Sequence, residues 1–304
     1  MKVSLIDVDG HNFPNFALMK LAAWHKALGD DVDWYSPLFS RPDRIYASKV
    51  FTFTPDNTGV SAWDPEPIKG GTGYRSCEEL SSEIDAMLPD YSIYPQYEFA
   101  IGFLSRGCIR NCPWCVVPRK EGALRQYDDI ERISQGRKNI VLMDNNFLAN
   151  ELEFIKEQIG KANKLKLSID FNQGLDARLV TPEIAKILAS ANWRASTGNN
   201  GYIRFSCDTM SCIEPVKAAV KMLREVGYKG EIFCYILAKD VPSALERIAT
   251  LTEFDRKIHP FVMPYRNLDG DGQITDRNLS RLARWCNMAS IRNSCKFEHY
   301  KGKL

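Results

Sequence analysis

From Glu98 onward the chain alternates short apolar runs with amphipathic stretches, and this alternation constrains the fold more than any other feature of the sequence. Six apolar runs are typical of strands: Phe99–Leu104, Asn139–Met143, Lys166–Asp170, Tyr202–Ser206, Glu231–Leu237 and Lys257–Val262. Helical patterns lie between them. Strands and helices that alternate at intervals of roughly 30 residues predict parallel βα units. Six units are fewer than the eight of a closed barrel, so we expect an α/β fold with an open, partial (βα)6 barrel, whose chemistry lies at the carboxyl ends of its strands.

The residues before this alternation predict a small Rossmann-like α/β domain. Lys2–Val8 has the pattern of a buried strand, and Phe16–Leu28 has the apolar spacing of a helix that ends at Gly29. Two prolines punctuate Pro89–Pro95, which predicts a linker. We therefore expect three parts: the Rossmann-like domain at 1–96, the partial barrel at 97–265, and a helical, basic C-terminal extension at 266–304.

Charge and hydropathy narrow the location and the partners of the protein. Forty basic and 38 acidic side chains give a formal charge of +2, which is too close to neutral to indicate a nucleic acid or an anionic membrane as partner. No apolar stretch approaches the roughly 18 residues that cross a bilayer. Asp7 and Asp9 interrupt the first ten residues, where a signal peptide stays apolar. The sequence therefore predicts a cytoplasmic protein that does not bind membranes.

Three of the nine cysteines, Cys108, Cys112 and Cys115, lie within eight residues of one another. Their spacing is C-x3-C-x2-C, and they follow directly after the first strand of the alternating region. Gly107 and Pro113 favour an irregular loop, so the three thiolates can turn toward one point. An odd number of cysteines without a secretory signal argues against a disulfide framework. The cluster therefore needs another explanation.

Three interpretations of this cluster compete. A structural zinc site normally has four ligands, and no fourth Cys or His follows within seventy residues. Buried thiols that only pack do not require such close spacing. An iron–sulfur cluster normally takes four thiolates, so three would leave one iron open to a ligand. Spacing and position together favour the iron–sulfur interpretation.

Polar residues gather at the ends of the second, third and fourth predicted strands. They are Asp144 and Asn145 after the second, Asn172, Gln173, Asp176 and Arg178 after the third, and Arg204, Ser206 and Asp208 at the fourth. Any one of them can simply cap a strand or face solvent. Because the carboxyl ends of parallel strands share one end of a barrel, the set as a whole favours a binding site.

The cysteine loop resembles that of the radical S-adenosylmethionine (SAM) superfamily, since Trp114 places an aromatic residue before the last cysteine at the end of the first barrel strand. The runs RGCIRNCPWC and DFNQGLDAR further resemble an uncharacterised group of bacterial and bacteriophage radical SAM proteins. The resemblance implies that Cys108, Cys112 and Cys115 hold a [4Fe–4S] cluster whose fourth iron is chelated by SAM. An electron from a flavodoxin- or ferredoxin-like donor would then split SAM to methionine and a 5′-deoxyadenosyl radical, which abstracts hydrogen from a substrate.

The resemblance also assigns roles to the polar strand ends. Asp144 and Asn145 stand where the superfamily usually has Gly-Gly-Glu near the SAM amino group, so they are candidate substitutes. The remaining candidates for SAM or substrate contacts are Trp114, Asn172, Gln173, Asp176, Arg178, Arg204, Ser206 and Asp208. The resemblance supplies no substrate, and a small molecule, a nucleotide or a macromolecule each stays open.

Two alternatives remain. Asp9-Gly10-His11 matches the start of the cobalamin motif D-x-H-x-x-G, which would make the protein a cobalamin-dependent radical SAM methylase, but Pro14 replaces the motif's glycine. That departure favours a degenerate cobalamin-binding-like domain over a working cobalamin site. The other alternative, from a different class, is a non-catalytic binding module whose three cysteines hold zinc.

Overall fold

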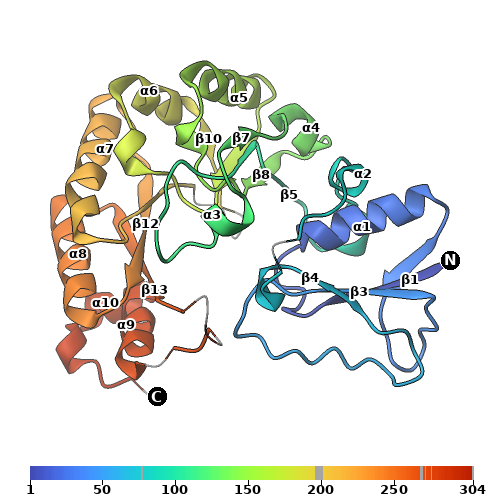
Figure 1. Cartoon of the computed structure of the whole chain (residues 1–304). Coiled ribbons are helices and arrows are strands. Elements are labelled where there is room, and N and C mark those ends of the chain that lie inside the picture. The colour runs from blue at the N-terminus through green and yellow to red at the C-terminus, as the bar shows by residue number, and fades with distance from the viewer. Residues whose placement is uncertain (77, 196–200, 268–269, 271, 275, 303–304) are drawn as a thin grey trace. The chain divides into compact units, whose positions relative to one another are not determined.

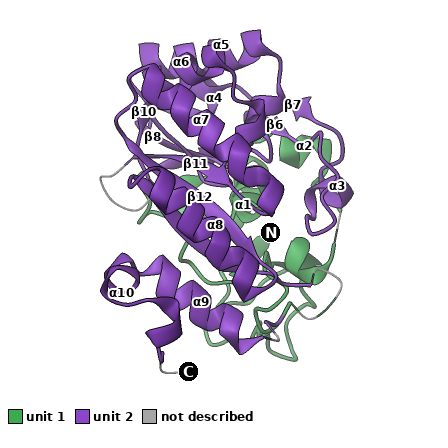
Figure 2. Ribbon diagram, turned by 90° about the vertical axis from the view of Figure 1, so that its left-hand side faces the viewer, with its two compact units in different colours: residues 1–98, 268–272 green, residues 99–267, 273–304 purple. Residues whose placement is uncertain are grey.

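The computed structural model describes residues 1–302 except 77, 196–200, 268–269, 271 and 275. The chain divides into two compact units (Figure 2): residues 1–98 with 268–272, and residues 99–267 with 273–304. The second unit carries the cysteine loop.

Unit 1 is built on a parallel sheet with the strand order β2-β1-β3-β4. Its strands are β1 (Lys2–Asp7), β2 (Asp31–Trp34), β3 (Arg44–Ser48) and β4 (Ile68–Gly70). Between β1 and β2 runs helix α1 (Phe16–Ala27), which begins where the Asn15 side chain accepts a hydrogen bond from the Leu18 N–H at 3.2 Å. The short segments η1 (Thr72–Tyr74), α2 (Ser82–Asp85) and η2 (Tyr91–Ile93) complete the unit.

All six strands predicted for the second region form, with small shifts at their ends. They are β5 (Ala100–Gly102), β8 (Asn139–Leu142), β9 (Ser168–Phe171), β11 (Tyr202–Ser206), β12 (Glu231–Ala238) and β13 (Ile258–Pro264). β5 and β8 are buried almost throughout, whereas buried and half-buried residues alternate along β12. Their pairings are all parallel, as the alternation of strands and helices predicts.

These strands form two sheets rather than one. A short additional strand, β10 (Asn192–Trp193), pairs with β9 and ends a sheet of order β10-β9-β8-β5, while β11, β12 and β13 form a second sheet. A single bridge between Leu175 and Phe205 joins the two, and the Leu175 N–H donates to the Arg204 carbonyl at 2.7 Å. Neither sheet closes among the described residues, so the unit is a mixed α/β fold with parallel sheets.

The helices of unit 2 pack in chain order, each against the next, and form an outer row (Figure 1). They are α4 (Ile130–Ser134), α5 (Leu152–Lys164), α6 (Pro182–Ser190), α7 (Ile213–Glu225), α8 (Val241–Phe254) and α9 (Arg277–Asn287). The Thr181 side chain caps α6 by accepting a hydrogen bond from the Ile184 N–H at 3.2 Å, with Pro182 at the first helical position. The row of helices is thus continuous where the sheets are not.

The end of the chain closes the outer edge of the second sheet. Helix α9 packs against β13, and the short segments α10 (Ala289–Ser294) and η6 (Phe297–His299) follow it. The Asn287 side chain accepts from the Val262 N–H at 2.7 Å and donates to the Val262 carbonyl at 3.0 Å. It therefore bonds to β13 as a neighbouring strand would. None of the described helices has the length and apolar character needed to cross a membrane.

Candidate functional site

The cysteine loop is held at its base by a short hairpin. β6 (Ser105–Arg106) pairs antiparallel with β7 (Arg125–Gln126), and the chain between them carries the three cysteines and the short helix α3 (Val117–Lys120). Arg106 donates two hydrogen bonds, of 2.7 and 3.0 Å, to the buried carboxylate of Glu121. These contacts close the loop as a unit attached to the end of β5.

A glycine is required directly before the first cysteine. Gly107 has φ +84°, and a Cβ atom there would lie 2.2 Å from the carbonyl oxygen of Ala123. Both its backbone conformation and the close approach therefore exclude other residues. The Gly107 N–H donates to the Asn145 side chain at 2.8 Å, and the Cys108 N–H donates to the Gly122 carbonyl at 3.2 Å. The position of Cys108 is thus fixed by hydrogen bonds from two consecutive backbone N–H groups, its own and that of Gly107.

Asp144, at the end of β8, lies beneath this loop. Its carboxylate accepts hydrogen bonds from the Leu104 N–H at 3.0 Å, the Ser105 N–H at 2.7 Å and the Ser105 hydroxyl at 2.8 Å. The side chain is 1% exposed, and burial raises its pKa to about 7 against the opposing effect of these hydrogen bonds. The sequence predicted Asp144 and Asn145 as cofactor contacts. The structure gives both side chains hydrogen bonds to the loop backbone, which orient the cysteines.

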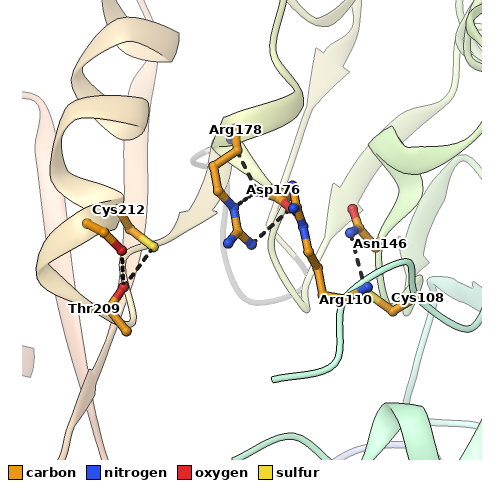
Figure 3. A network of polar contacts seen from close by, with 8 residues as sticks. Cys108, Arg110, Asn146, Asp176, Arg178, Thr209 and Cys212 are labelled. Atoms are coloured by element: carbon orange, nitrogen blue, oxygen red, sulfur yellow. Dashed lines mark hydrogen bonds and ion pairs between the residues drawn. The ribbon is translucent and has the colours of Figure 1, made fainter. Parts of the chain in front are cut away.

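The three thiols are half-buried and close enough to influence one another. Burial raises the pKa of Cys112 and of Cys115, and Cys108 adds to the rise at both. Two donors reach the Cys108 Sγ, namely the Arg110 N–H and the Asn146 amide Nδ2, each at 3.3 Å (Figure 3). Such donors suit a sulfur that carries negative charge.

The described residues contain no group of three His, Cys, Asp or Glu side chains arranged to hold a single metal ion. A cubane cluster makes a different demand, because each thiolate binds a different iron and the ligands need not converge on one point. One loop that offers three half-buried thiols, with N–H donors directed at one of them, fits such a group.

The end of β9 connects to the loop through a carboxylate that lies between two arginines. Asp176 accepts from Arg110 of the loop at 3.1 Å and from Arg178 at 2.6 and 3.0 Å (Figure 3). Burial alone would raise the pKa of Asp176, but the Arg178 guanidinium outweighs it and holds the pKa below its usual range. Asp176 also begins η4 (Ala177–Leu179) by accepting from the Arg178 N–H at 3.1 Å.

The ends of β11 and β12 reach the other side of the loop. Burial raises the pKa of Asp208, with Arg247 and a hydrogen bond from Trp114 opposing the rise, and the Asp208 Oδ1 has no hydrogen-bond partner among the described residues. The buried Arg247 donates to the carbonyls of Cys207 at 2.6 Å and Leu237 at 3.0 Å, which ties the two strand ends together.

Trp114 also contacts the residue that follows β12. The Lys239 Nζ lies 4.4 Å from the Trp114 ring centroid and 5.0 Å from that of Tyr265, which follows β13. Side chains after β8, β9, β11 and β12 therefore all reach this one loop. An aromatic face next to an ammonium group is a stable pair even when part of it is exposed.

Not every predicted contact lies at this site. Arg204 pairs with Asp170 through hydrogen bonds of 2.6 and 2.9 Å and is 9% exposed, so this ion pair accounts for its charge within the fold. Gln173 is exposed and donates to the Asn172 side chain at 3.2 Å, while Ser206 is half-buried at the end of β11. Asn172, Gln173 and Ser206 lie at strand ends, as predicted, whereas Arg204 lies in the middle of β11. The contacts described join none of these four residues to the cysteine loop.

Sequence reasoning missed Arg110, Asn146 and Lys239. Asn146 stands in the same polar run as Asp144 and Asn145, so the run itself was a usable signal. Lys239 directly follows β12 and had the position of a strand-end residue. Arg110 lies between two cysteines, where spacing gives no information about which side chain turns outward.

In unit 1, the residues that resemble a cobalamin motif have local partners. The Asp9 carboxylate accepts hydrogen bonds from the Val50 N–H and the Thr54 hydroxyl, and the His11 ring lies 4.2 Å from that of Trp34. A Cβ atom on Gly71, which has φ +99°, would lie 2.4 Å from the Lys49 carbonyl oxygen. Packing within unit 1 thus accounts for this glycine and for Asp9. Cys77, the remaining cysteine of this region, lies outside the described residues.

No protein-family model and no curated protein matches this chain. Solved structures do match it, and one of them is the crystal structure of methylornithine synthase (PylB). It is 12% identical, with a TM-score of 0.43, and the match covers 71% of this chain and 72% of that one. A TM-score this low does not establish a shared fold, so the proposed function rests on the residues of this chain.

Proposed function

We propose that this chain is a radical SAM enzyme whose second unit is an open, partial (βα)6 barrel. One observation carries the proposal: side chains that follow four successive strands of the predicted barrel all reach the loop that bears Cys108, Cys112 and Cys115. The continuous row of helices outside the two sheets supports the barrel arrangement. A zinc site that only stabilises the fold would not require polar side chains from four strands around it.

In this proposal Cys108, Cys112 and Cys115 hold a [4Fe–4S] cluster. The cluster, when bound, supplies the electron that cleaves SAM to methionine and a 5′-deoxyadenosyl radical. The chain's own residues hold the cysteine loop in position. Asp144 and Asn145 fix the loop backbone, and the ring of Trp114 holds the loop against Lys239 after β12.

The ligand contacts we propose come from strand ends. The Oδ1 of Asp208, which finds no donor in the described part of the chain, is an acceptor suited to a hydroxyl or amine of SAM or substrate, because a buried acceptor without a donor is costly. Arg178, 40% exposed beside Asp176, offers N–H groups to a carboxylate. Asn172, Gln173 and Ser206 are further candidates near the same strand ends. A flavodoxin- or ferredoxin-like protein is the proposed electron donor.

The test is anaerobic reconstitution with iron and sulfide, followed by dithionite and SAM, with chromatographic detection of 5′-deoxyadenosine. We expect about four irons per chain and 5′-deoxyadenosine from the native protein. Cys112→Ala should abolish both. Cys295→Ala is the matched control, because Cys295 is an equally half-buried thiol that lies outside the loop, and it should leave both unchanged.

Other outcomes would support other functions. One zinc per chain after anaerobic purification, without iron or sulfide, would identify a zinc-stabilised binding module and refute the proposal. Corrinoid absorbance after reconstitution with cobalamin, in addition to the cluster, would instead indicate the cobalamin-dependent methylase. If the native protein binds neither cluster nor SAM, the radical SAM assignment is wrong.

A further inference from the structure

We infer that Asn146 raises the reduction potential of the cluster through a hydrogen bond to the Cys108 sulfur. The inference rests on the proposed function, since it concerns the group that the three cysteines hold. It makes Asn146 a positioning residue that acts through Cys108, and it links one side chain to the ease with which an electron donor reduces the protein.

Asn146 is placed for this role by its burial and by its position in the chain. It follows β8 and precedes η3 (Phe147–Ala149), and its carbonyl accepts from the Ala149 N–H at 3.1 Å. The side chain is 3% exposed, and its Nδ2 lies 3.3 Å from the Cys108 Sγ (Figure 3). A side chain held at the end of a strand and inside the fold cannot easily turn away from the sulfur.

The chemistry of the sulfur fixes the direction of this hydrogen bond. A ligating thiolate has no hydrogen to donate, so the amide must present its N–H. An N–H donor stabilises the more negative, reduced state of the group on that sulfur more than the oxidised state, and this raises the reduction potential. The Arg110 N–H donates to the same sulfur at 3.3 Å, but it belongs to the backbone, so a substitution of Asn146 does not remove this donor.

The surroundings of the Asn146 Oδ1 indicate that packing does not explain an asparagine at this position. Its Oδ1 is buried and has no hydrogen-bond partner among the described residues. An unsatisfied buried acceptor costs about 1–3 kcal/mol, and a leucine of similar size would avoid that cost. An amide at this position is therefore explained by what its Nδ2 donates to.

Neighbouring asparagines provide the contrast. The Asn145 side chain accepts from the Gly107 N–H, and the Asn150 side chain donates to the Ser105 hydroxyl at 2.9 Å and the Phe147 carbonyl at 2.8 Å. Both hold the base of the loop or the turn after β8, and neither of these contacts involves a cysteine sulfur. Asn150 lies at the opposite end of η3 from Asn146. It therefore offers a matched control.

The experiment is an anaerobic redox titration of the reconstituted full-length protein, with the reduced cluster followed by electron paramagnetic resonance. Asn146→Leu removes the donor and keeps the volume, and Asn146→Asp keeps the shape but replaces the donor with a carboxylate. We expect the reduced-to-oxidised ratio at a fixed potential to fall about tenfold in Asn146→Leu, a midpoint about 59 mV more negative for a one-electron couple. The midpoint of Asn146→Asp should be more negative still, and Asn150→Leu should have the native midpoint.

Each result decides the inference. A native midpoint in both Asn146 variants that carry the cluster would overturn it, as would an equal shift in Asn150→Leu, because then disturbance of the turn explains the effect. Loss of the cluster from both Asn146 variants would show that Asn146 holds the loop together, and this too would overturn a tuning role. If the native protein itself takes up no cluster, the proposed function fails rather than the role of Asn146 alone.

Discussion

At the end of β8, three consecutive polar residues bind three different parts of one loop. Asp144 holds the backbone at Leu104 and Ser105, Asn145 holds the Gly107 N–H, and Asn146 donates to the Cys108 sulfur. Adjacent residues at the end of a strand point in different directions, so one short run can serve three positions. Which loop atom each residue contacts depends on the positions of the loop's N–H groups and sulfur in the folded chain, and the sequence does not show these positions.

Asp7, at the end of β1, gives unit 1 a predicted dependence on pH. The Tyr94 hydroxyl donates to its carboxylate at 2.6 Å, and burial nevertheless raises the pKa of Asp7 to about 6. Because this pKa is higher in the folded than in the unfolded chain, the folded state retains the proton between about pH 4 and 6. Stability is therefore present below this window and is lost as the pH rises through it.

The variant Asp7→Asn should remove this loss, since the amide keeps an acceptor for Tyr94 but does not ionise. We expect the fall in the free energy of unfolding between pH 4 and pH 7 to be smaller by about 2 kcal/mol than in the native protein. Urea denaturation at both pH values measures it. Asp31→Asn, at an exposed position in β2, is the control. An unchanged pH profile in Asp7→Asn would refute the role of Asp7.

At the scale of the element, the cysteine loop depends on its glycines in unequal ways. Gly107 and Gly122 both have positive φ angles, of +84° and +69°. A Cβ atom on Gly107 would collide with the backbone of Ala123, whereas one on Gly122 would meet nothing within 4 Å. A residue other than glycine would be strained by the backbone conformation at both positions, but it would collide with a neighbouring atom only at Gly107.

Alanine at the two positions should separate these contributions. Gly122→Ala should cost about 1 kcal/mol of unfolding free energy, from the left-handed backbone alone. Gly107→Ala should cost roughly 1–3 kcal/mol more, because the loop must shift, and it should also lower the iron bound after reconstitution. Equal losses in the two variants, by denaturation and by iron analysis, would show that the close approach at Gly107 is not limiting.

The elements themselves were largely predictable. Buried apolar runs such as Asn139–Leu142 have a period, and a helix start such as Thr181-Pro182 before α6 has a boundary signal, that sequence alone carries. β10 (Asn192–Trp193) was not predicted, because two residues have no period. The hairpin of β6 and β7 was also missed, since its strands are equally short and its pairing depends on contacts such as that of Arg106 with Glu121.

At the scale of the whole molecule, the order in which the strands pair could not be predicted from the sequence. The alternation of strands and helices predicts parallel strands in order, but β10 pairs with β9, and only the bridge at Leu175 and Phe205 links the two sheets. Which strand ends approach the cysteine loop depends on that pairing. The candidate list therefore contained Asp176 and Asp208, which reach the loop, together with Arg204, whose charge is taken up by Asp170.

The contact between the last long helix and β13 should contribute measurably to the stability of unit 2. Asn287→Ala removes both hydrogen bonds to Val262 and leaves a backbone N–H and C=O without these partners. We expect the free energy of unfolding to fall by about 1–3 kcal/mol, as measured by urea denaturation. Asn278→Ala, at an exposed position on the same helix, should stay near the native value. A fall of the same size in Asn278→Ala would trace the effect to helix propensity.

The same asparagine has a consequence for how the protein behaves among copies of itself. β13 is the last strand of its sheet, and an uncovered strand is a template on which a second chain can add its own. The Asn287 side chain occupies the N–H and the carbonyl of Val262 and so blocks part of this template. A side-chain amide offers no further backbone groups with which an added strand could pair. We expect this cover to make the outer strand of the sheet a poorer template for strand addition by a second chain.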